Sequence, residues 1–311
     1  MIRIIADSAA DYGAIENTKE LTIVPLSINL DGKEYLDSVT ITPDEFYSKL
    51  LTASDFPKTS CPSPHSFYEA MKPGVEAGDE ILVVALSSGI SGTVGSANVA
   101  AKMFENAKIT VYDTLQASMG ERILVDLARK LVKEGKSVKE IVEILDEVSS
   151  RVTTLTLVDD LSYAVKGGRI SKAKAIVGAI ARIKSMVNVD EKGRARNNHS
   201  VIGRARAYKY LVKRFNTLEI DKTFPIYTAY TDKPDNLDKY MEKINDKLGD
   251  VEIIKGRWGA TVGSHAGKSG FGVFYVRKFA KEESFIDKIK ESFEETKEQL
   301  EERLKRNKEK N

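Results

Sequence analysis

The sequence predicts an α/β fold in which a mostly parallel sheet is flanked by helices, and two observations carry this prediction. Strand-like apolar runs alternate with helical patterns through the first half of the chain, as in doubly wound parallel sheets. The clearest run, residues 81–86 (ILVVAL), is continuously apolar and rich in β-branched side chains, which is typical of a strand buried on both faces. A loop at residues 87–93 (SSGISGT), here called the serine loop, joins it to an alanine-rich helical stretch.

The other elements of the first half have their own local signals. Apolar and β-branched composition predicts strands at residues 3–7, 22–30 and 108–112. Thr42-Pro43-Asp44-Glu45 is a capping box with proline at the first helical position, and Ser63-Pro64 begins the next helix. Apolar residues at helical spacing predict further helices at residues 94–104, 116–133 and 137–149.

The character of the chain changes near residue 155. We therefore expect an N-terminal α/β domain at residues 1–157, a second α/β domain at 158–281 and a charged helix at 282–311. A short helix should end at the glycine pair 167–168 and be followed by an apolar helix at 172–184 and a hairpin at 184–195. The remaining expected elements are strands at 224–230, 251–255 and 271–276 and a helix at 234–248. His265 is expected in a loop at residues 263–270.

Composition excludes several classes of protein. With 311 residues, 41% hydrophobic and 30% charged, the chain resembles an ordinary globular protein that buries one large core or two smaller ones. No apolar run reaches the length of a membrane span, and the first residues do not resemble a secretory signal. Because Cys61 is the single cysteine, no internal disulfide can form, and we expect a cytoplasmic protein.

The serine loop is the strongest candidate for a binding site. It lies at the carboxyl end of a predicted parallel strand, where open α/β sheets bind ligands, and its helix offers free backbone N–H groups to an anion. The hydroxyl groups of Ser88, Ser91 and Thr93 add donors, so we predict a small anionic head group there. The alternative is a helix cap and tight turn without a ligand.

Three other stretches carry polar side chains with similar alternatives. Thr59 and Ser60 lie in a stiff, proline-rich segment and either aim hydroxyl groups at a ligand or belong to a rigid connection. Arg169 beside the glycine pair either pairs with a carboxylate or phosphate or binds a surface carboxylate or helix-end carbonyl groups. His265 is either a ligand contact or an ordinary loop histidine.

Nucleic-acid binding and metal chemistry are not expected. Residues 192–214 carry eight basic and no acidic side chains, which would suit an acidic partner protein, a phosphate-rich ligand or nucleic acid. We interpret them as a solvated helix face, because aromatic residues are not interleaved as in nucleic-acid platforms and the net charge is only +2. His65, His199 and His265 are far apart in sequence, and neither a zinc-ligand spacing nor a phosphate-binding P-loop is present.

Six stretches, taken in order, resemble the DegV family of bacterial fatty-acid-binding proteins. They cover roughly residues 2 to 280 and are Asp7-Ser8, the TSCPSP stretch from Thr59, the serine loop, Asp113-Thr114, the KGGRIS stretch around Arg169 and the His265 loop. Three positions depart from the family pattern: Cys61 stands where glutamine is common, Ser185 where proline is common, and Ile202 where some members have arginine. Arg204 or Arg206 is a possible replacement for that arginine.

The resemblance implies a long-chain fatty acid held between two α/β domains, with Thr59, Ser91 and His265 binding its carboxylate. Arg169, Ser60, Ser88 and Gly92 are expected nearby or facing a partner. It further implies a carrier that does no chemistry itself and needs no cofactor or metal. Such a carrier presents the fatty acid to a separate fatty acid kinase, which forms acyl phosphate for phospholipid synthesis, and contacts membranes transiently. Ile176, Val177, Ile180, Phe271 and Phe274 are candidates for lining the acyl chain.

Two other functions remain possible on sequence grounds. In a serine hydrolase, Ser91 would be the nucleophile and His265 the base, with Asp7 or Asp113 as the acidic third member. The residues around Ser91 do not match the G-x-S-x-G nucleophile elbow, because glycine follows the serine directly. The other alternative is a binding protein for a phosphorylated metabolite that uses the same helix N-terminus.

Overall fold

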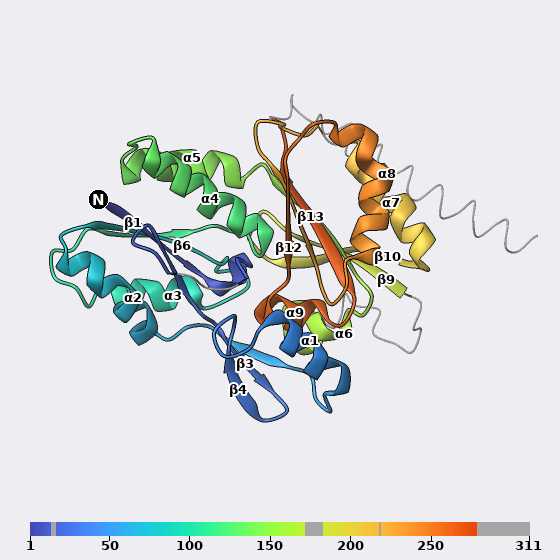
Figure 1. Cartoon of the computed structure of the whole chain (residues 1–311), viewed down its shortest axis with the longest axis horizontal. Helices are drawn as coiled ribbons and strands as arrows, with labels where there is room; N and C mark the ends of the chain where they lie inside the picture. The colour runs from blue at the N-terminus through green and yellow to red at the C-terminus, as the bar shows by residue number, and fades with distance from the viewer. Residues whose placement is uncertain (14–16, 172–182, 218, 279–311) are drawn as a thin grey trace, which may run out of the picture. The chain divides into compact units, whose positions relative to one another are not determined.

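The computed structural model describes residues 1–13, 17–171, 183–217 and 219–278. Within them, Met1–Arg277 form one compact unit with two main sheets and one small sheet (Figure 1). The helix expected at 172–184 lies outside the described residues up to residue 182, and so does the helix expected at 282–311. The predicted domain limits at residues 157 and 281 stay a proposal.

The first sheet is parallel, as predicted, with the strand order β2-β1-β6-β7. Alternate residues of its strands pack on opposite faces, against α2 and α3 on one side and α4 and α5 on the other (Figure 1). This burial on both faces explains the continuous apolar runs. The strands are β1 (Ile2–Asp7), β2 (Leu21–Val24), β6 (Glu80–Ala85) and β7 (Ile109–Asp113). The helices are α2 (Pro64–Glu76), α3 (Thr93–Ala101), α4 (Met119–Lys133) and α5 (Val138–Ser149).

The strand expected at residues 22–30 is wrong as a single element. Pro25 lacks an N–H group and has a fixed φ angle, so the ladder ends at β2 and the chain turns into a different sheet. There β3 (Ser27–Leu30) pairs with β4 (Lys33–Leu36) and β5 (Lys58–Ser60), all antiparallel. Helix α1 (Pro43–Thr52) begins with the predicted capping box. As a result Thr59, in β5, is held opposite Ile28 of β3.

The second main sheet has six strands in the order β10-β9-β8-β13-β11-β12 and is antiparallel except between β11 and β12. Helices α7 (Arg204–Thr217) and α8 (Asp235–Leu248) cover one face, and α4 contacts the other (Figure 1). The strands are β8 (Val152–Val158), β9 (Ile183–Val189), β10 (Ala195–Ile202), β11 (Ile226–Tyr230), β12 (Ile253–Arg257) and β13 (Gly270–Val276). The predicted hairpin is β9 and β10.

The loop expected around His265 is also wrong. Residues Ala260–Ala266 form helix α9, and His265 lies in its last turn. Two other short helices border the same region: η1 (Ser8–Ala10), which follows β1, and α6 (Ser162–Lys166), which ends before the glycine pair as predicted. No helix of the described segments is both long and apolar enough to cross a bilayer.

Candidate functional site

A mostly apolar cavity of about 140 Å³ lies between the two main sheets. Its walls come from the segments that follow β1 and β6, from α9 and from strands β8, β9 and β13. The carboxyl ends of β1 and β6 therefore face it, as expected for an open parallel sheet. Its apolar side chains include Leu26, Leu86, Ile90, Ile170, Val187, Val262 and Phe274.

Four predicted residues meet at this cavity, which is lined by Thr59, Ser91, Arg169 and His265. Thr59 Oγ1 lies 2.9 Å from His265 Nε2, although 206 residues separate them in sequence. Ser91 Oγ lies 2.9 Å from Thr93 Oγ1 at the start of α3. The cavity lining therefore carries hydroxyl, imidazole and guanidinium groups, and the Thr59 hydroxyl group lies directly beside the imidazole.

The other predicted residues have different positions. Ser60, Ser88 and Gly92 are exposed and do not line the cavity. Phe274 lines it, whereas Phe271 packs in a separate core beneath α7 and α8. The other three acyl-chain candidates, at positions 176, 177 and 180, lie outside the described residues.

His265 is a neutral imidazole near pH 7. Burial, and to a smaller extent the charge of Arg169, lowers its pKa to about 3. Its Nδ1 atom has no hydrogen-bond partner among the described residues. A Cβ atom on Gly167 would lie 2.3 Å from that nitrogen, so glycine is needed there for the backbone to pass the ring. The imidazole is therefore fixed between the backbone of Gly167 and the hydroxyl group of Thr59.

The serine loop is fixed by the second sheet. Ser87 Oγ donates to the carbonyl oxygen of Gly193 in the β9–β10 turn at 2.7 Å. A Cβ atom on Gly89 would lie 2.5 Å from the carbonyl oxygen of Lys192, so glycine is required for this close approach. Ser87 is thus a structural residue. Gly92 caps α3 without a side-chain hydrogen bond, which leaves the first N–H groups of α3 without that partner.

Arg169 binds a helix-end carbonyl group, which is one of the alternatives left open by the sequence. Its Nη1 donates to the carbonyl oxygen of Gly167 at 2.6 Å, and the side chain also lines the cavity. Burial lowers the pKa of its guanidinium. Arg204 binds Asp159 and Asn236, whereas Arg206 and Ile202 are exposed. Arg204 is therefore already engaged in an ion pair, and neither arginine lines the cavity.

Buried acidic residues, Asp7, Asp11, Asp37 and Glu121, form an acid cluster behind the cavity wall. Asp37 accepts hydrogen bonds from the N–H groups of Ala260 and Thr261 at 3.0 and 3.1 Å, and Asp11 accepts one from Gly259 at 2.9 Å. These two side chains cap the N-terminus of α9 by accepting its first N–H groups, and burial raises the pKa of both carboxyl groups.

The rest of the acid cluster supports the loops of the first sheet. Asp7 accepts hydrogen bonds from the N–H groups of Leu86 and Ala9. Burial raises the pKa of Asp7 to about 6. It also raises the pKa of Glu121 well above its usual range, and the neighbouring charge of Asp7 acts in the same direction. Burial and the charge of Asp7 therefore both favour the protonated form of Glu121.

The geometry does not match a Ser-His-Asp triad. The hydroxyl group of Ser91 bonds to Thr93, and the imidazole bonds to Thr59 instead of to Ser91. Asp7 and Asp113 accept hydrogen bonds from backbone N–H groups, and neither orients His265. His65 and His199 stack on tyrosine rings elsewhere, and no cluster of potential metal ligands occurs among the described residues.

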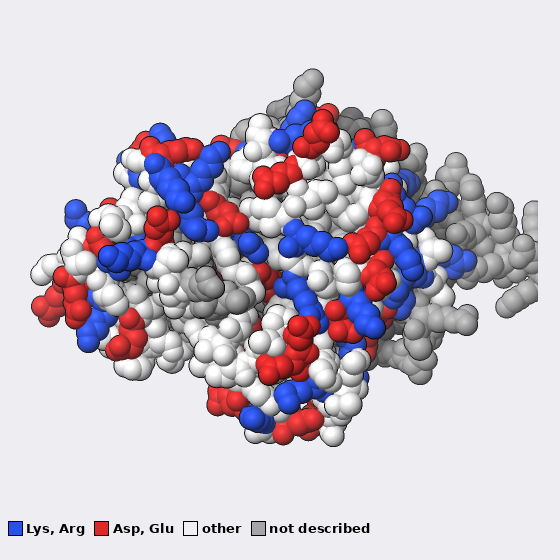
Figure 2. Space-filling model, viewed as in Figure 1, with Lys and Arg blue, Asp and Glu red and all other residues white. Residues whose placement is uncertain are grey.

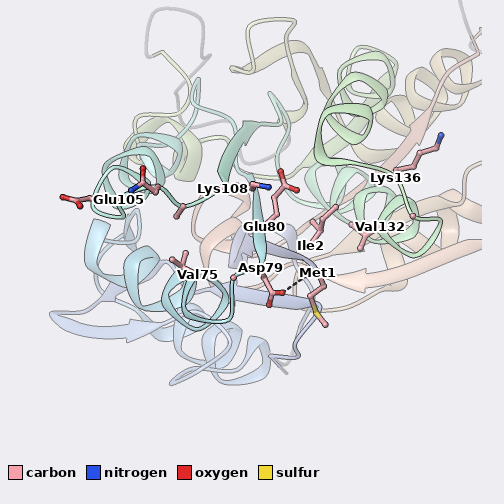
Figure 3. A pocket seen from close by; sticks show the side chains of 13 residues that line it. Met1, Ile2, Val75, Asp79, Glu80, Glu105, Lys108, Val132 and Lys136 are labelled. Carbon is pink, nitrogen blue, oxygen red and sulfur yellow. Dashed lines mark hydrogen bonds and ion pairs between the residues drawn. The ribbon is translucent and has the colours of Figure 1, made fainter.

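Two other hollows carry none of the predicted carboxylate-binding residues. One of about 730 Å³ opens at the amino end of the parallel sheet, where the Met1 amino group lies 2.7 Å from Asp79 Oδ1 (Figure 3). The other, here called the groove, measures about 880 Å³ and runs beside β8 and β9. Figure 2 shows acidic and basic side chains interspersed on the face in view.

Comparison with known proteins identifies the family. A family model described as "Uncharacterised protein, DegV family" matches residues 1–278. The chain belongs to the DegV family. DegV domain-containing proteins of Caldanaerobacter subterraneus and Lactococcus lactis are each 32% identical to it. The alignments cover 89% and 90% of this chain and 99% of each relative.

Solved DegV structures share the fold. A DegV family protein from Thermus thermophilus, described as binding fatty acid, has a TM-score of 0.78 and 28% identity. That match covers 89% of this chain and 99% of the other. The fatty acid kinase B3 protein of Streptococcus pneumoniae, solved with linoleic acid, has a TM-score of 0.78 at 22% identity, with 89% and 99% covered. The predicted family and fold class are thus confirmed.

Several residues that shape this DegV site were missed by the sequence analysis. Ser118 lines the cavity and has a φ angle of 57°, a strained conformation for a residue other than glycine. Its hydroxyl group donates to Asp11 at 2.6 Å and accepts from Trp258 Nε1 at 2.8 Å. Thr261 lines the cavity as well. In the sequence, the single tryptophan followed by glycine, at residues 258–259, is the local feature that could have pointed to this site. Nothing in the local sequence distinguishes Asp37 or Ser118.

Proposed function

We propose that this DegV protein binds a long-chain fatty acid, with Thr59, Ser91 and His265 holding the carboxylate. One observation carries the proposal: a mostly apolar cavity has hydroxyl and imidazole groups side by side in its lining. An isolated carboxylate in an apolar site is costly, and hydrogen-bond donors offset that cost. The description of the Thermus thermophilus relative as fatty-acid-binding supports the same ligand class.

The neutral imidazole can determine the direction in which the Thr59 hydroxyl group donates its hydrogen bond. If His265 Nε2–H donates to Thr59 Oγ1, the Thr59 hydroxyl proton is free to point at the carboxylate. The Ser91 hydroxyl and the N-terminus of α3 supply further donors, and Arg169 supplies positive charge. His265 thus acts on the carboxylate together with Thr59.

The acyl chain supplies most of the affinity in this proposal. Each buried CH₂ group contributes about 0.8 kcal/mol, so a long chain binds tightly with few polar contacts. We further propose that the protein is a carrier without a cofactor that presents the carboxyl group to a separate fatty acid kinase and takes up its ligand in brief contact with a membrane. These finer points rest on the family resemblance alone.

Calorimetric titration of delipidated protein tests the ligand class. Palmitic acid should bind at least about tenfold more tightly than palmityl alcohol, because only the acid makes charge-assisted hydrogen bonds. Equal affinity for the two would contradict carboxylate recognition. Glycerol phosphate is titrated in the same way to test the phosphorylated-metabolite alternative. If glycerol phosphate binds and palmitic acid does not, the lipid proposal is wrong.

A further inference from the structure

The cavity at the candidate site and the groove share part of their lining. Thr154, Thr156, Val187, Asn188 and Val189 line both spaces. The cavity alone, at about 140 Å³, is smaller than the roughly 300–1,000 Å³ of typical ligand pockets. The groove adds about 880 Å³ next to it. A ligand with a long chain therefore needs the second space as well as the first.

The strand register shows where the two spaces meet. β8 pairs with β13 along its whole length, from Val152 to Val158. Its pairing with β9 covers only Thr156 to Val158, opposite Val187 to Ser185. From Thr156 toward Val152 the pairing does not continue, so the ladder between β8 and β9 ends beside Thr154 and Asn188. This end of the ladder is here called the split. The residues at this split are the same ones that line both the cavity and the groove.

The split carries polar side chains as well as apolar ones. Thr154 and Thr156 carry hydroxyl groups, and Asn188 carries an amide. The side-chain oxygen of Asn188 is buried and has no hydrogen-bond partner among the described residues. A buried acceptor without a partner costs stability, and a donor that reaches it removes the cost. A plain methyl group does not provide that donor.

We propose that the far end of the bound acyl chain passes between β8 and β9 and that the site takes fatty acids with a hydroxyl group toward that end. This inference rests on the proposed fatty acid binding and names the class of fatty acid. The hydroxyl group donates to the side-chain oxygen of Asn188, while the carboxylate stays at Thr59 and Ser91. The polar groove then receives a polar chain end instead of a bare hydrocarbon.

Competitive binding to the full chain tests this assignment. The probes are stearic acid and a series of hydroxystearic acids in which the hydroxyl group moves along the chain. In the wild-type protein, at least one hydroxylated acid should bind about twofold to tenfold more tightly than stearic acid, the gain expected for one hydrogen bond. In Asn188→Leu this preference should disappear or reverse.

Asn198→Leu is the matched control, because Asn198 lines the groove but not the cavity. It should keep the wild-type preference. If stearic acid binds but every hydroxylated acid binds more weakly, or if Asn188→Leu leaves the preference unchanged, the inference is wrong and fatty acid binding stands. If no acid of either kind binds, the proposed function itself fails. Circular dichroism of both variants establishes that they are folded.

Discussion

His265 sets the chemistry of the polar part of the cavity lining at the scale of single residues. Its neutral ring next to Thr59 orders a hydroxyl donor without placing a second full positive charge beside Arg169. The close approach of Gly167 fixes the ring from the other side. Ser91 reaches the same cavity from the serine loop, so residues far apart in sequence meet in one site.

Ser91→Ala should weaken fatty acid binding about tenfold or more, because it removes a hydroxyl group that bonds to a charged carboxylate. Ser88→Ala is the matched control in the same loop, since Ser88 is exposed and does not line the cavity. Its affinity should equal that of the wild type. Titration of a long-chain fatty acid into each delipidated variant measures the two affinities. Equal losses of affinity in the two variants would show that Ser91 does not bind the carboxylate.

The contribution of His265 to stability should fall in mild acid. Its pKa is about 3 in the folded protein, against 6.5 for an ordinary histidine, so below pH 6.5 the unfolded chain binds a proton that the folded protein does not. The contribution of His265 therefore decreases as the pH drops from about 6.5 toward 3. Asp7 acts in the opposite direction, because its raised pKa keeps a proton on the folded protein up to about pH 6.

Urea unfolding of the wild type and His265→Gln, measured at several pH values, checks this. In the variant the unfolded chain has no histidine at this position to bind a proton. The free energy of unfolding of the variant, relative to that of the wild type, should therefore increase as the pH is lowered. A constant difference between the two proteins across the range would show that His265 is not buried as a neutral ring.

At the scale of elements, α9 connects the acid cluster to the cavity. Its N-terminus is capped by Asp11 and Asp37, and its last turn carries His265. Neither carboxylate belongs to α9 or to a residue near it in sequence. Both come from the loops that follow β1 and β4, so the helix depends on the tertiary fold to form.

Asp37→Ala should lower the free energy of unfolding by about 2 kcal/mol or more, since it leaves two buried N–H groups without partners. Thr42→Ala is the comparison, because it removes an exposed cap on α1 and should cost about 1 kcal/mol. Chemical denaturation measures both changes. A smaller loss for Asp37→Ala than for Thr42→Ala would mean that α9 does not need its carboxylate cap.

The dependence of α9 on distant residues explains what the sequence could and could not predict about these elements. The capping box of α1 is local, and it was predicted correctly. The segment of α9 contains Gly263 and Ser264 and is followed by Gly267, a composition that favours a loop. Its stabilising carboxylates lie more than 200 residues away, so no local pattern identifies the helix.

At the scale of the whole molecule, the two main sheets share one core. Ile4 and Leu82 of the first sheet and Tyr227 and Phe274 of the second pack in the same cluster with side chains of α4. The cavity lies between these sheets. The alternation of strands and helices predicts the first sheet, but contacts such as Ser87 to Gly193 join distant segments and have no signal in the sequence.

Because the cavity lies between the sheets, a bound fatty acid should stabilise the whole unit. At a free concentration one hundred times the dissociation constant, the free energy of unfolding should rise by about 2.7 kcal/mol. Ser91→Ala, at that same concentration, should gain less, because its affinity is lower. Calorimetric unfolding with and without ligand measures the gain, and an unchanged transition in the wild type would contradict binding at this cavity.

The most direct test of the central claim is native mass spectrometry of the purified protein, followed by denaturing extraction and identification of released lipid. We expect one adduct per chain, released as a long-chain fatty acid and lost in the double variant Thr59→Ala, Ser91→Ala. A protein that is empty after purification and stays empty after incubation with fatty acids would contradict the account.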